Sequence, residues 1–171
     1  MKQLVRVASG QGFWGDWLEA PRRQVEGGQV DYLMLDYLAE VTMSILQKQK
    51  ERDPKMGYAR DFIGAIESVL PGIVERGVKV IANAGGVNPR SCADALLELA
   101  DRKGVRGKLA LGVVTGDDLL PRLDELMAQG HALANMDTGE PLALVRDRVL
   151  SANAYIGSTP IIEALGKGAN I

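Results

Sequence analysis

The feature that most constrains the fold is an alternation of short apolar runs with amphipathic segments of helical spacing. The runs are rich in Val, Ile or Leu, as strands buried on both faces are, and cover residues 3–8, 30–35, 78–84 and 108–114. Apolar residues recur at helical spacing in residues 38–46, 62–73, 92–100 and 119–127. Repeated strand–helix units predict an α/β fold: a mostly parallel, twisted sheet with helices on both faces, in Rossmann-like layers.

Glycine and proline support these boundaries. Gly28, Gly77, Gly107 and Gly168 each stand shortly before an apolar run or the final residues, where a helix ends in a left-handed turn. Pro71 falls inside the segment 62–73 and predicts a kinked or split helix.

Two segments depart from the alternation. Residues 131–149 carry a turn at 137–141 between short alternating runs, which predicts a small β-excursion. A helix is expected over 159–166, after which Gly168 leads into Ala-Asn-Ile. Because the earlier glycine junctions lead into strands, these last residues suggest the start of another parallel strand. We therefore expect residues 1–171 to be a single α/β domain that is the N-terminal part of a longer one.

Composition excludes several classes of function. The formal net charge is -2, the pI is near 5.5 and no basic stripe is visible, so nucleic acid is not an expected partner. No apolar run approaches the roughly 20 residues of a membrane helix, and the N-terminal apolar stretch is too short for a secretory signal. Cys92 is the single cysteine and His131 the single histidine, so disulfides and histidine-rich metal sites are excluded. These features predict a cytoplasmic protein.

In a parallel sheet, ligands bind beyond the carboxyl ends of the strands, so each strand-to-helix turn is a candidate site. The first turn matches G-x-G-x-x-G through Gly10, Gly12 and Gly15, and Asp36 follows about twenty residues later, as in dinucleotide-binding folds. Two bulky aromatic residues in the loop and the negative charge of Asp16 count against a phosphate. The loop can therefore bind a dinucleotide, bind another ligand, or be a structural turn.

The second turn places Asp36 at a strand end and Glu40 one helical turn later. Such a carboxylate pair can hold a divalent cation or share general acid and base roles. The alternative is that both simply stabilise the start of the following helix.

The third turn is the most informative. Asn83 is a polar residue at the end of a buried strand, and Gly85 and Gly86 expose backbone N–H groups near a helix start. Asn88, followed by proline, is expected to cap that helix. Together these groups can bind an anion or a carbonyl that gains charge during a reaction, unless Asn83 only satisfies nearby backbone.

Further candidates follow along the chain. Asp117 and Asp118 after the run 108–114 suit Mg²⁺, a substrate hydroxyl or a ribose, or one of them caps the next helix. Asn153 is a polar residue among small ones near an expected strand end. Cys92 lies near a helix start, where a thiolate is favoured, but it shares the apolar stripe of that helix, which favours a packing role. His131 is expected to be a surface residue rather than an acid or base.

These motifs form a recognisable set, and the chain resembles the acyclic terpene utilisation family, AtuA. The resemblance runs essentially from end to end and is most specific at Asn-Ala-Gly-Gly-Val-Asn-Pro and Ala-Asn-Ala-Tyr-Ile-Gly. The matching segments are residues 10–16, 36–40, 83–89, 116–118 and 152–157. It implies a bacterial cytosolic protein in the degradation of branched acids such as citronellate or geraniate, as CoA thioesters. Members of the family are longer and continue into a further strand, and the resemblance supplies no reaction. Its matching site candidates are Asp16, Asp36, Glu40, Asn83, Asn88, Asp118 and Asn153.

The leading hypothesis is an enzyme, or enzyme subunit, acting on a small organic acid or acyl-CoA by a lyase or hydratase step. The expected catalytic residues are Asp16, Asp36, Asn83 and Asp118, with no metal ligands and no assigned cofactor. The expected ligand-binding residues are Gly10, Gly12, Gly15, Gly85, Gly86, Asn88 and Asn153. The alternatives are a nucleotide- or CoA-binding module without chemistry of its own, and a subunit that completes a partner's site, with a homo-oligomer also possible.

Overall fold

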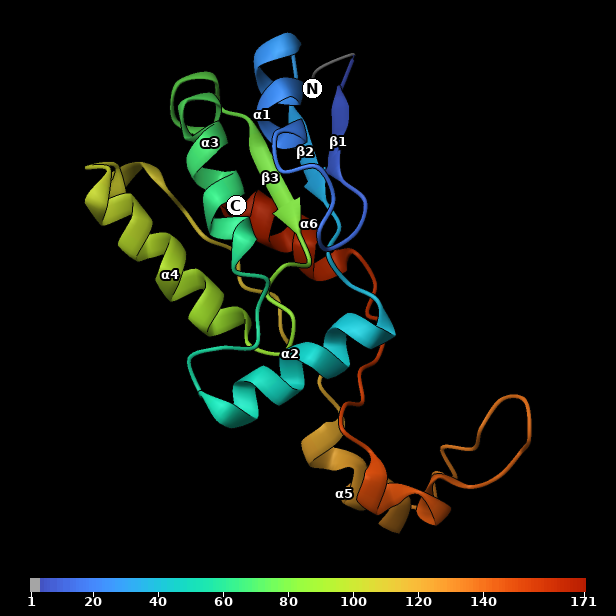
Figure 1. Cartoon of the computed structure of the whole chain (residues 1–171). Helices are drawn as coiled ribbons and strands as arrows, with labels where there is room; N and C mark the ends of the chain where they lie inside the picture. Colours follow the sequence, from blue (N-terminus) through green and yellow to red (C-terminus); the bar gives the residue numbers. More distant parts are fainter. Residues whose placement is uncertain (1–3) are drawn as a thin grey trace. The chain divides into compact units, whose positions relative to one another are not determined.

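The computed structural model describes residues 4–171 and has an α/β architecture around a small parallel sheet (Figure 1). The sheet has the order β1–β2–β3, formed by Val7–Gln11, Tyr32–Leu35 and Lys79–Ala82. Both pairings are parallel, with Val7 opposite Tyr32 and Leu33 opposite Val80. The predicted parallel α/β fold is therefore confirmed.

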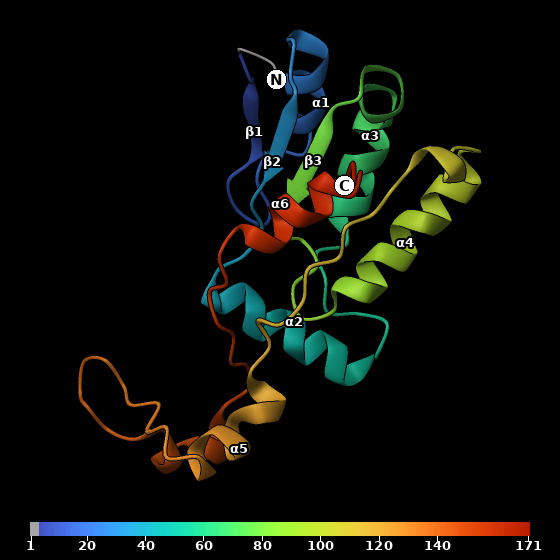
Figure 2. The same ribbon diagram turned by 180° about the vertical axis from the view of Figure 1, so that it is seen from behind.

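The helices follow the strands along the chain. α1 (Ala20–Gly27) joins β1 to β2, while α2 (Glu40–Arg52) and α3 (Asp61–Arg76) join β2 to β3. α4 (Pro89–Arg102) follows β3, and α6 (Thr159–Gly166) lies near the end of the chain. Right-handed crossovers that all step the same way across a sheet place their helices on one face. Accordingly α1 packs against α3 and α3 against α4, whereas α6 lies on the opposite face (Figures 1 and 2).

The core lies between the sheet and the α1–α3 layer. Leu33 and Ile66 are fully buried, and Val80, Val69 and Val25 are each no more than 2% exposed. Along β2, buried Leu33 and Leu35 alternate with exposed Met34, because successive side chains of a strand point to opposite faces. The carboxyl ends of the three strands are thereby fixed against one another.

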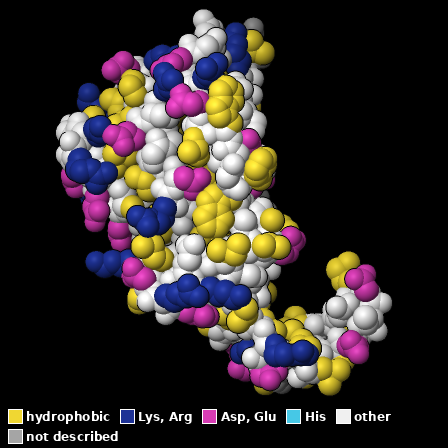
Figure 3. Space-filling model, in the orientation of Figure 1, with side chains coloured by type: hydrophobic (Ala, Val, Ile, Leu, Met, Phe, Trp, Pro, Cys, Tyr) yellow, Lys and Arg dark blue, Asp and Glu magenta, His cyan; other side chains and the backbone are white. Residues whose placement is uncertain are grey.

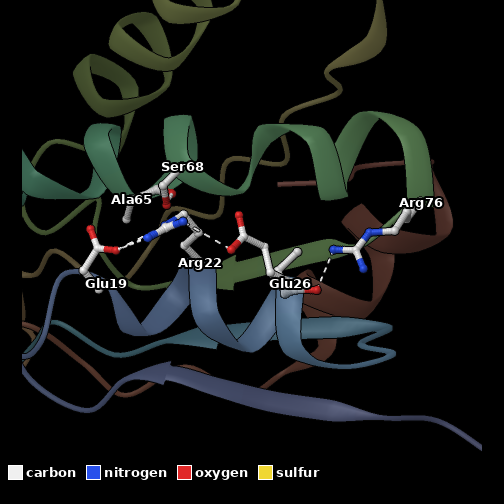
Figure 4. A network of polar contacts seen from close by, with 7 residues as sticks. Glu19, Arg22, Glu26, Ala65, Ser68 and Arg76 are labelled. Carbon is white, nitrogen blue, oxygen red and sulfur yellow. Dashed lines mark hydrogen bonds and ion pairs between the residues drawn. The ribbon is translucent and has the colours of Figure 1, made fainter.

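The contact between α1 and α3 is close and is framed by polar groups. On α1, Arg22 pairs with Glu19 and Glu26, and Arg76 of α3 donates to the carbonyl oxygen of Val25 at 2.6 Å (Figure 4). Pro71 does not split α3, which runs unbroken from Asp61 to Arg76. The proline is exposed on the outer side of the helix, so its ring does not disturb the packed face.

Two predicted strands differ from the prediction: the first is shifted and that of residues 108–114 is absent. Residue Gln3 of the first run lies outside the described residues, and β1 begins only at Val7 and continues to Gln11. Residues 108–114 form no strand: a 3-10 helix occupies Arg106–Lys108, and Ala110 accepts hydrogen bonds from the backbone N–H groups of Asn170 and Ile171. Asn170 in turn accepts from the N–H of Val80 at 2.9 Å. Residue 170 therefore links residue 110 to β3.

Residues 115–157 form one compact unit, and residues 4–114 together with 158–171 form another. Within it, 3-10 helices at Leu120–Arg122, Leu142–Leu144 and Arg146–Arg148 accompany α5 (Leu123–Ala128). The β-excursion predicted for 131–149 was wrong: the segment is a turn with single backbone pairings, such as Asn135 N–H to Glu140 O at 2.9 Å, and no strand. All its side chains from 131 to 141 are exposed, so no packed neighbour supports a ladder.

Candidate functional site

The candidate site centres on a hydrogen-bonded pair at the carboxyl ends of two neighbouring strands. Asp36 follows β2 and Asn83 follows β3. The Nδ2 of Asn83 donates to Oδ1 of Asp36 at 2.6 Å, and Oδ1 of Asn83 accepts from the backbone N–H of Tyr37 at 2.7 Å. The same carboxylate oxygen accepts from the N–H of Leu38 at 3.2 Å. The structure thus brings together two residues that lie 47 positions apart in the sequence.

The geometry of the pair leaves reactive groups available. Both side chains are exposed, and within residues 4–171 the second oxygen of Asp36, Oδ2, receives no hydrogen bond. The amide of Asn83 also keeps a second hydrogen, since Nδ2 carries two. The arrangement therefore presents an oriented carboxylate beside a fixed amide donor, which suits proton transfer next to a carbonyl group.

The first loop is closed by Asp16 rather than open to an anion. Oδ2 of Asp16 accepts from the N–H of Gly12 at 3.0 Å, and Oδ1 accepts from the N–H of Trp17 at 2.7 Å. These backbone hydrogen bonds, that of Gly12 foremost, lower the pKa of Asp16 below its ordinary value of 3.8. An ionised side chain thus occupies donors that a phosphate would use.

The loop also lacks the helix that a dinucleotide fingerprint requires. α1 begins at Ala20, so the first helical turn starts beyond Gly15 rather than at the glycines, and Asp16 is a loop residue and not its cap. Gly10 lies within β1, where an added Cβ would meet Leu35 Cδ2 at 2.8 Å. Gly15 has a φ of 96° and open space around it, as a turn glycine does.

The third turn is held by hydrogen bonds within the turn and to the loop of residues 54–57. The N–H of Gly86 donates to the carbonyl of Asn83 at 3.2 Å, and a Cβ on Gly86 would collide with Gly57 O. Asn88 caps α4 by accepting from Ser91 N–H at 3.4 Å, as predicted. Its Nδ2 donates to the carbonyl oxygens of Pro54 and Met56, which uses both amide hydrogens. Gly86 and Asn88 therefore shape the turn that carries Asn83.

Other candidates take structural positions. Cys92 is 4% exposed, and burial raises the pKa of its thiol to about 12, so the favoured packing role is confirmed over a thiolate. Glu40 is the first residue of α2. Among the described residues, no group of three or more His, Cys, Asp or Glu side chains is placed to hold a metal ion.

A second polar group lies within the unit of residues 115–157. The backbone of Asp118 pairs antiparallel with that of Asn153, and Asn153 Nδ2 donates to Asp117 Oδ2 at 3.0 Å. Asp118 Oδ1 accepts from the N–H of Leu120 at 3.1 Å, a local hydrogen bond, and the 3-10 helix Leu120–Arg122 has Leu119 before it and no side-chain cap. The segment after residue 114 and the Ala-Asn-Ala-Tyr segment therefore do meet. His131 is exposed.

Sequence reasoning missed Gln11, the last residue of β1. Its side chain is 2% exposed, and its backbone carbonyl accepts from Asp36 N–H at 3.0 Å. It also missed the contact between Trp14 Nε1 and Asp61 Oδ1, at 3.0 Å, which ties the first loop to the start of α3. A polar residue between two glycines at a strand end was the available signal for Gln11.

Comparison with known families decides the classification. The model of the acyclic terpene utilisation family protein AtuA matches residues 5–171. The chain belongs to this family. Neither the curated proteins nor the solved structures contain a match to it. No described helix has the length and apolar character needed to cross a membrane. Membership of the AtuA family implies involvement in acyclic terpene utilisation.

Proposed function

We propose that this AtuA family chain is an enzyme, or a subunit of one, that moves a proton on a branched organic acid or its CoA thioester. A lyase or hydratase step fits best, because both require proton transfer beside a carbonyl group. The observation that carries the proposal is the exposed Asp36 carboxylate held by Asn83 at the carboxyl edge of the sheet.

Each member of the pair has a distinct role. Asp36 is the proton-transfer group, since Asn83 and the N–H of Leu38 fix Oδ1 and leave Oδ2 to face the substrate. Asn83 positions this carboxylate, and its remaining amide hydrogen stabilises negative charge on the thioester oxygen. Asp16 is assigned to holding the first loop, because both its oxygens already accept backbone hydrogen bonds.

A nucleotide- or CoA-binding module without chemistry is the weaker candidate. Asp16 occupies the backbone N–H of Gly12 in the glycine loop, and α1 starts too late to place its N-terminus against a phosphate. On the face in Figure 3, Lys and Arg side chains are interspersed with Asp and Glu, so this face offers no continuous basic field for a phosphate.

The proposal is tested by isotope exchange, which needs no knowledge of the complete reaction. Citronellyl-CoA and geranyl-CoA are incubated with the protein in D₂O, and deuterium incorporation is followed by mass spectrometry. General acid–base catalysis contributes roughly 10²–10⁴-fold, so Asp36→Asn should reduce exchange by about that factor. Asn83→Ala should reduce it by about tenfold or more through loss of positioning.

Asp94→Asn provides the matched control, because Asp94 is an exposed carboxylate on α4 and not part of the site. It should exchange at the wild-type rate, and thermal melts of all variants show whether the fold is kept. Absence of exchange by the wild-type protein with either thioester, or normal exchange by a folded Asp36→Asn variant, would contradict the proposal.

A further inference from the structure

The third turn, residues 83–88, is the segment that places Asn83 beside Asp36. The carbonyl oxygen of Asn83 accepts from the N–H of Gly86 at 3.2 Å, which closes the turn. The side chain of Asn83 donates to the carboxylate of Asp36 at 2.6 Å. Because a connecting segment has no ladder of its own, its position depends on what packs against it. The contacts that hold this turn therefore decide how Asn83 meets Asp36.

Helix α2 is the element that lies against this turn. The side chain of Val87 is 6% exposed and forms a buried cluster with Met43 and Leu46 of α2. Gly86 lies so close to the helix that an added Cβ would clash with Leu46 Cδ1. In both ribbon views the chain between β3 and α4 comes down to α2 (Figures 1 and 2). The third turn is thus seated on α2 by close packing.

Lys50, near the C-terminal end of α2, adds a polar contact to this packing. Its Nζ donates to the backbone carbonyl oxygen of Val87 at 2.7 Å, across 37 positions of the sequence. A lysine on a surface helix ordinarily extends its ammonium group into water. Lys50 is instead half-buried, and a hydrogen bond from a charged donor is about twice as strong as one between neutral groups. The ammonium group therefore fixes the peptide unit between Val87 and Asn88.

The same helix is also joined directly to Asp36. Residues 37–39 connect Asp36 to Glu40, the first residue of α2, and Oδ1 of Asp36 accepts from the N–H of Leu38 in this link. One end of α2 is thus tied to Asp36, while Lys50 near the other end holds the turn of Asn83. Rigid helices of this kind transmit displacements between distant groups. A shift of the third turn on α2 therefore changes the geometry between the carboxylate and the amide.

We propose that Lys50 is a positioning residue for the Asp36–Asn83 pair and acts through the carbonyl oxygen of Val87. The inference rests on the proposed function for its effect on catalysis, because Asn83 orients the carboxylate that moves the proton. The hydrogen bond of Lys50 goes to the turn and not to either member of the pair. Its loss leaves the turn, and with it the amide of Asn83, less firmly held, and small misplacements of this kind slow reactions strongly.

Deuterium exchange on citronellyl-CoA gives the catalytic readout. Lys50→Met keeps the hydrocarbon stem but removes the donor, so the maximal exchange rate should fall by about tenfold. The thioester concentration that gives half of this rate should stay at the wild-type value, because the substrate contacts are intact. Lys50→Arg supplies a charged donor again and should recover most of the rate. Lys48→Met is the matched control, because Lys48 is an exposed lysine on the same helix, and it should exchange like the wild type.

A double-mutant cycle shows whether Lys50 acts through Asn83. Lys50→Met combined with Asn83→Ala should exchange no more than about twofold slower than Asn83→Ala alone, because the amide that Lys50 positions is already absent. Gly72→Ala controls for stability, since an added Cβ there would clash with Val25 Cγ1 on another part of the sheet's helical layer. At a temperature where all variants are folded, Gly72→Ala should keep the wild-type rate.

The side-chain amide of Asn83 reports its own position without any reaction. Its proton and nitrogen chemical shifts, measured by NMR on isotope-labelled protein, depend on the hydrogen bond to Asp36. Asn83→Ala identifies these signals by their absence, and Asp36→Ala gives their values when the hydrogen bond cannot form. Lys50→Met should move the signals toward the Asp36→Ala values, whereas Lys48→Met should leave them in place.

The outcomes separate this inference from the proposed function. Unmoved Asn83 signals in a folded Lys50→Met variant, or rate losses that multiply in the double variant, would overturn the role of Lys50 even where Asp36→Asn abolishes exchange. If the wild-type protein exchanges neither thioester, the proposed function fails. Shifted Asn83 signals in Lys50→Met would in that case still support the positioning of this amide by Lys50.

Discussion

At the scale of single residues, Asp16 shows how one side chain decides what a glycine-rich loop can do. Its carboxylate accepts from the backbone N–H groups of Gly12 and Trp17, which lowers its pKa from the ordinary value of 3.8. A carboxylate whose pKa is lowered by folding stabilises the protein above its unfolded pKa, and this contribution is lost as the pH falls through the folded pKa.

Asp16→Asn tests this at the same scale, because asparagine keeps the shape but offers one acceptor oxygen. The urea midpoint of the variant should lie below that of the wild type at pH 7. The gap should begin to close as the pH falls below about 4 and vanish once Asp16 is protonated in both states. Denaturant unfolding at a series of pH values checks this, and a gap that is constant down to pH 2 would contradict it.

Single residues also show how far the sequence predicts the site. The meeting of Asp36 and Asn83 follows from the rule that parallel strands end on one edge, and the sequence is sufficient for that. The sequence does not predict which hydrogen bonds the side chains make. Asn88 was a ligand candidate, yet the carbonyl oxygens of Pro54 and Met56 accept both of its amide hydrogens. That outcome depends on where a distant loop packs.

At the scale of elements, the local sequence pattern predicts a helix or strand correctly where contacts with distant segments do not change its structure. The strands 32–35 and 79–82 were predicted from short runs rich in Val, Ile or Leu, and the helices from α2 to α4 from apolar residues at helical spacing. Residues 108–114 have the same apolar character, but their backbone pairs with the short segment 170–171 rather than with a strand. A strand requires a partner of matching length, and the pattern of one segment says nothing about its neighbour.

The α1–α3 contact yields a prediction with an internal control. A Cβ on Gly72 of α3 would clash with Val25 Cγ1, whereas nothing lies within 4 Å of one on Gly64 of the same helix. Gly72→Ala should destabilise the protein by about 1–3 kcal/mol through overpacking. Gly64→Ala should stabilise it by roughly 0.5–1 kcal/mol, because alanine favours the helix. Chemical denaturation measures both, and equal effects would show that α1 does not pack closely on α3.

At the scale of the whole molecule, the two compact units differ in how much core they hold. Of the buried hydrophobic residues, only Leu123 belongs to residues 115–157. That unit is held instead by polar contacts such as the two hydrogen bonds from Arg146 to Asp124 at 2.7 and 3.0 Å. Exposed ion pairs of this kind contribute little free energy, so the cooperative stability of the chain resides in the sheet and its helices.

Hydrogen exchange measured by mass spectrometry distinguishes the two units. Amides of residues 131–150 should exchange within minutes, because their side chains are largely exposed and most of their backbone hydrogen bonds close short turns that water can reach. Amides of β2 and of the buried face of α3 should exchange last, at rates set by global unfolding. If residues 131–150 were instead protected as strongly as β2, a surface of a second copy or of the same chain must cover them in solution. Repeating the measurement at lower protein concentration distinguishes these two explanations. Protection that falls with protein concentration means that a second copy supplies the cover, whereas protection that persists means that the same chain does.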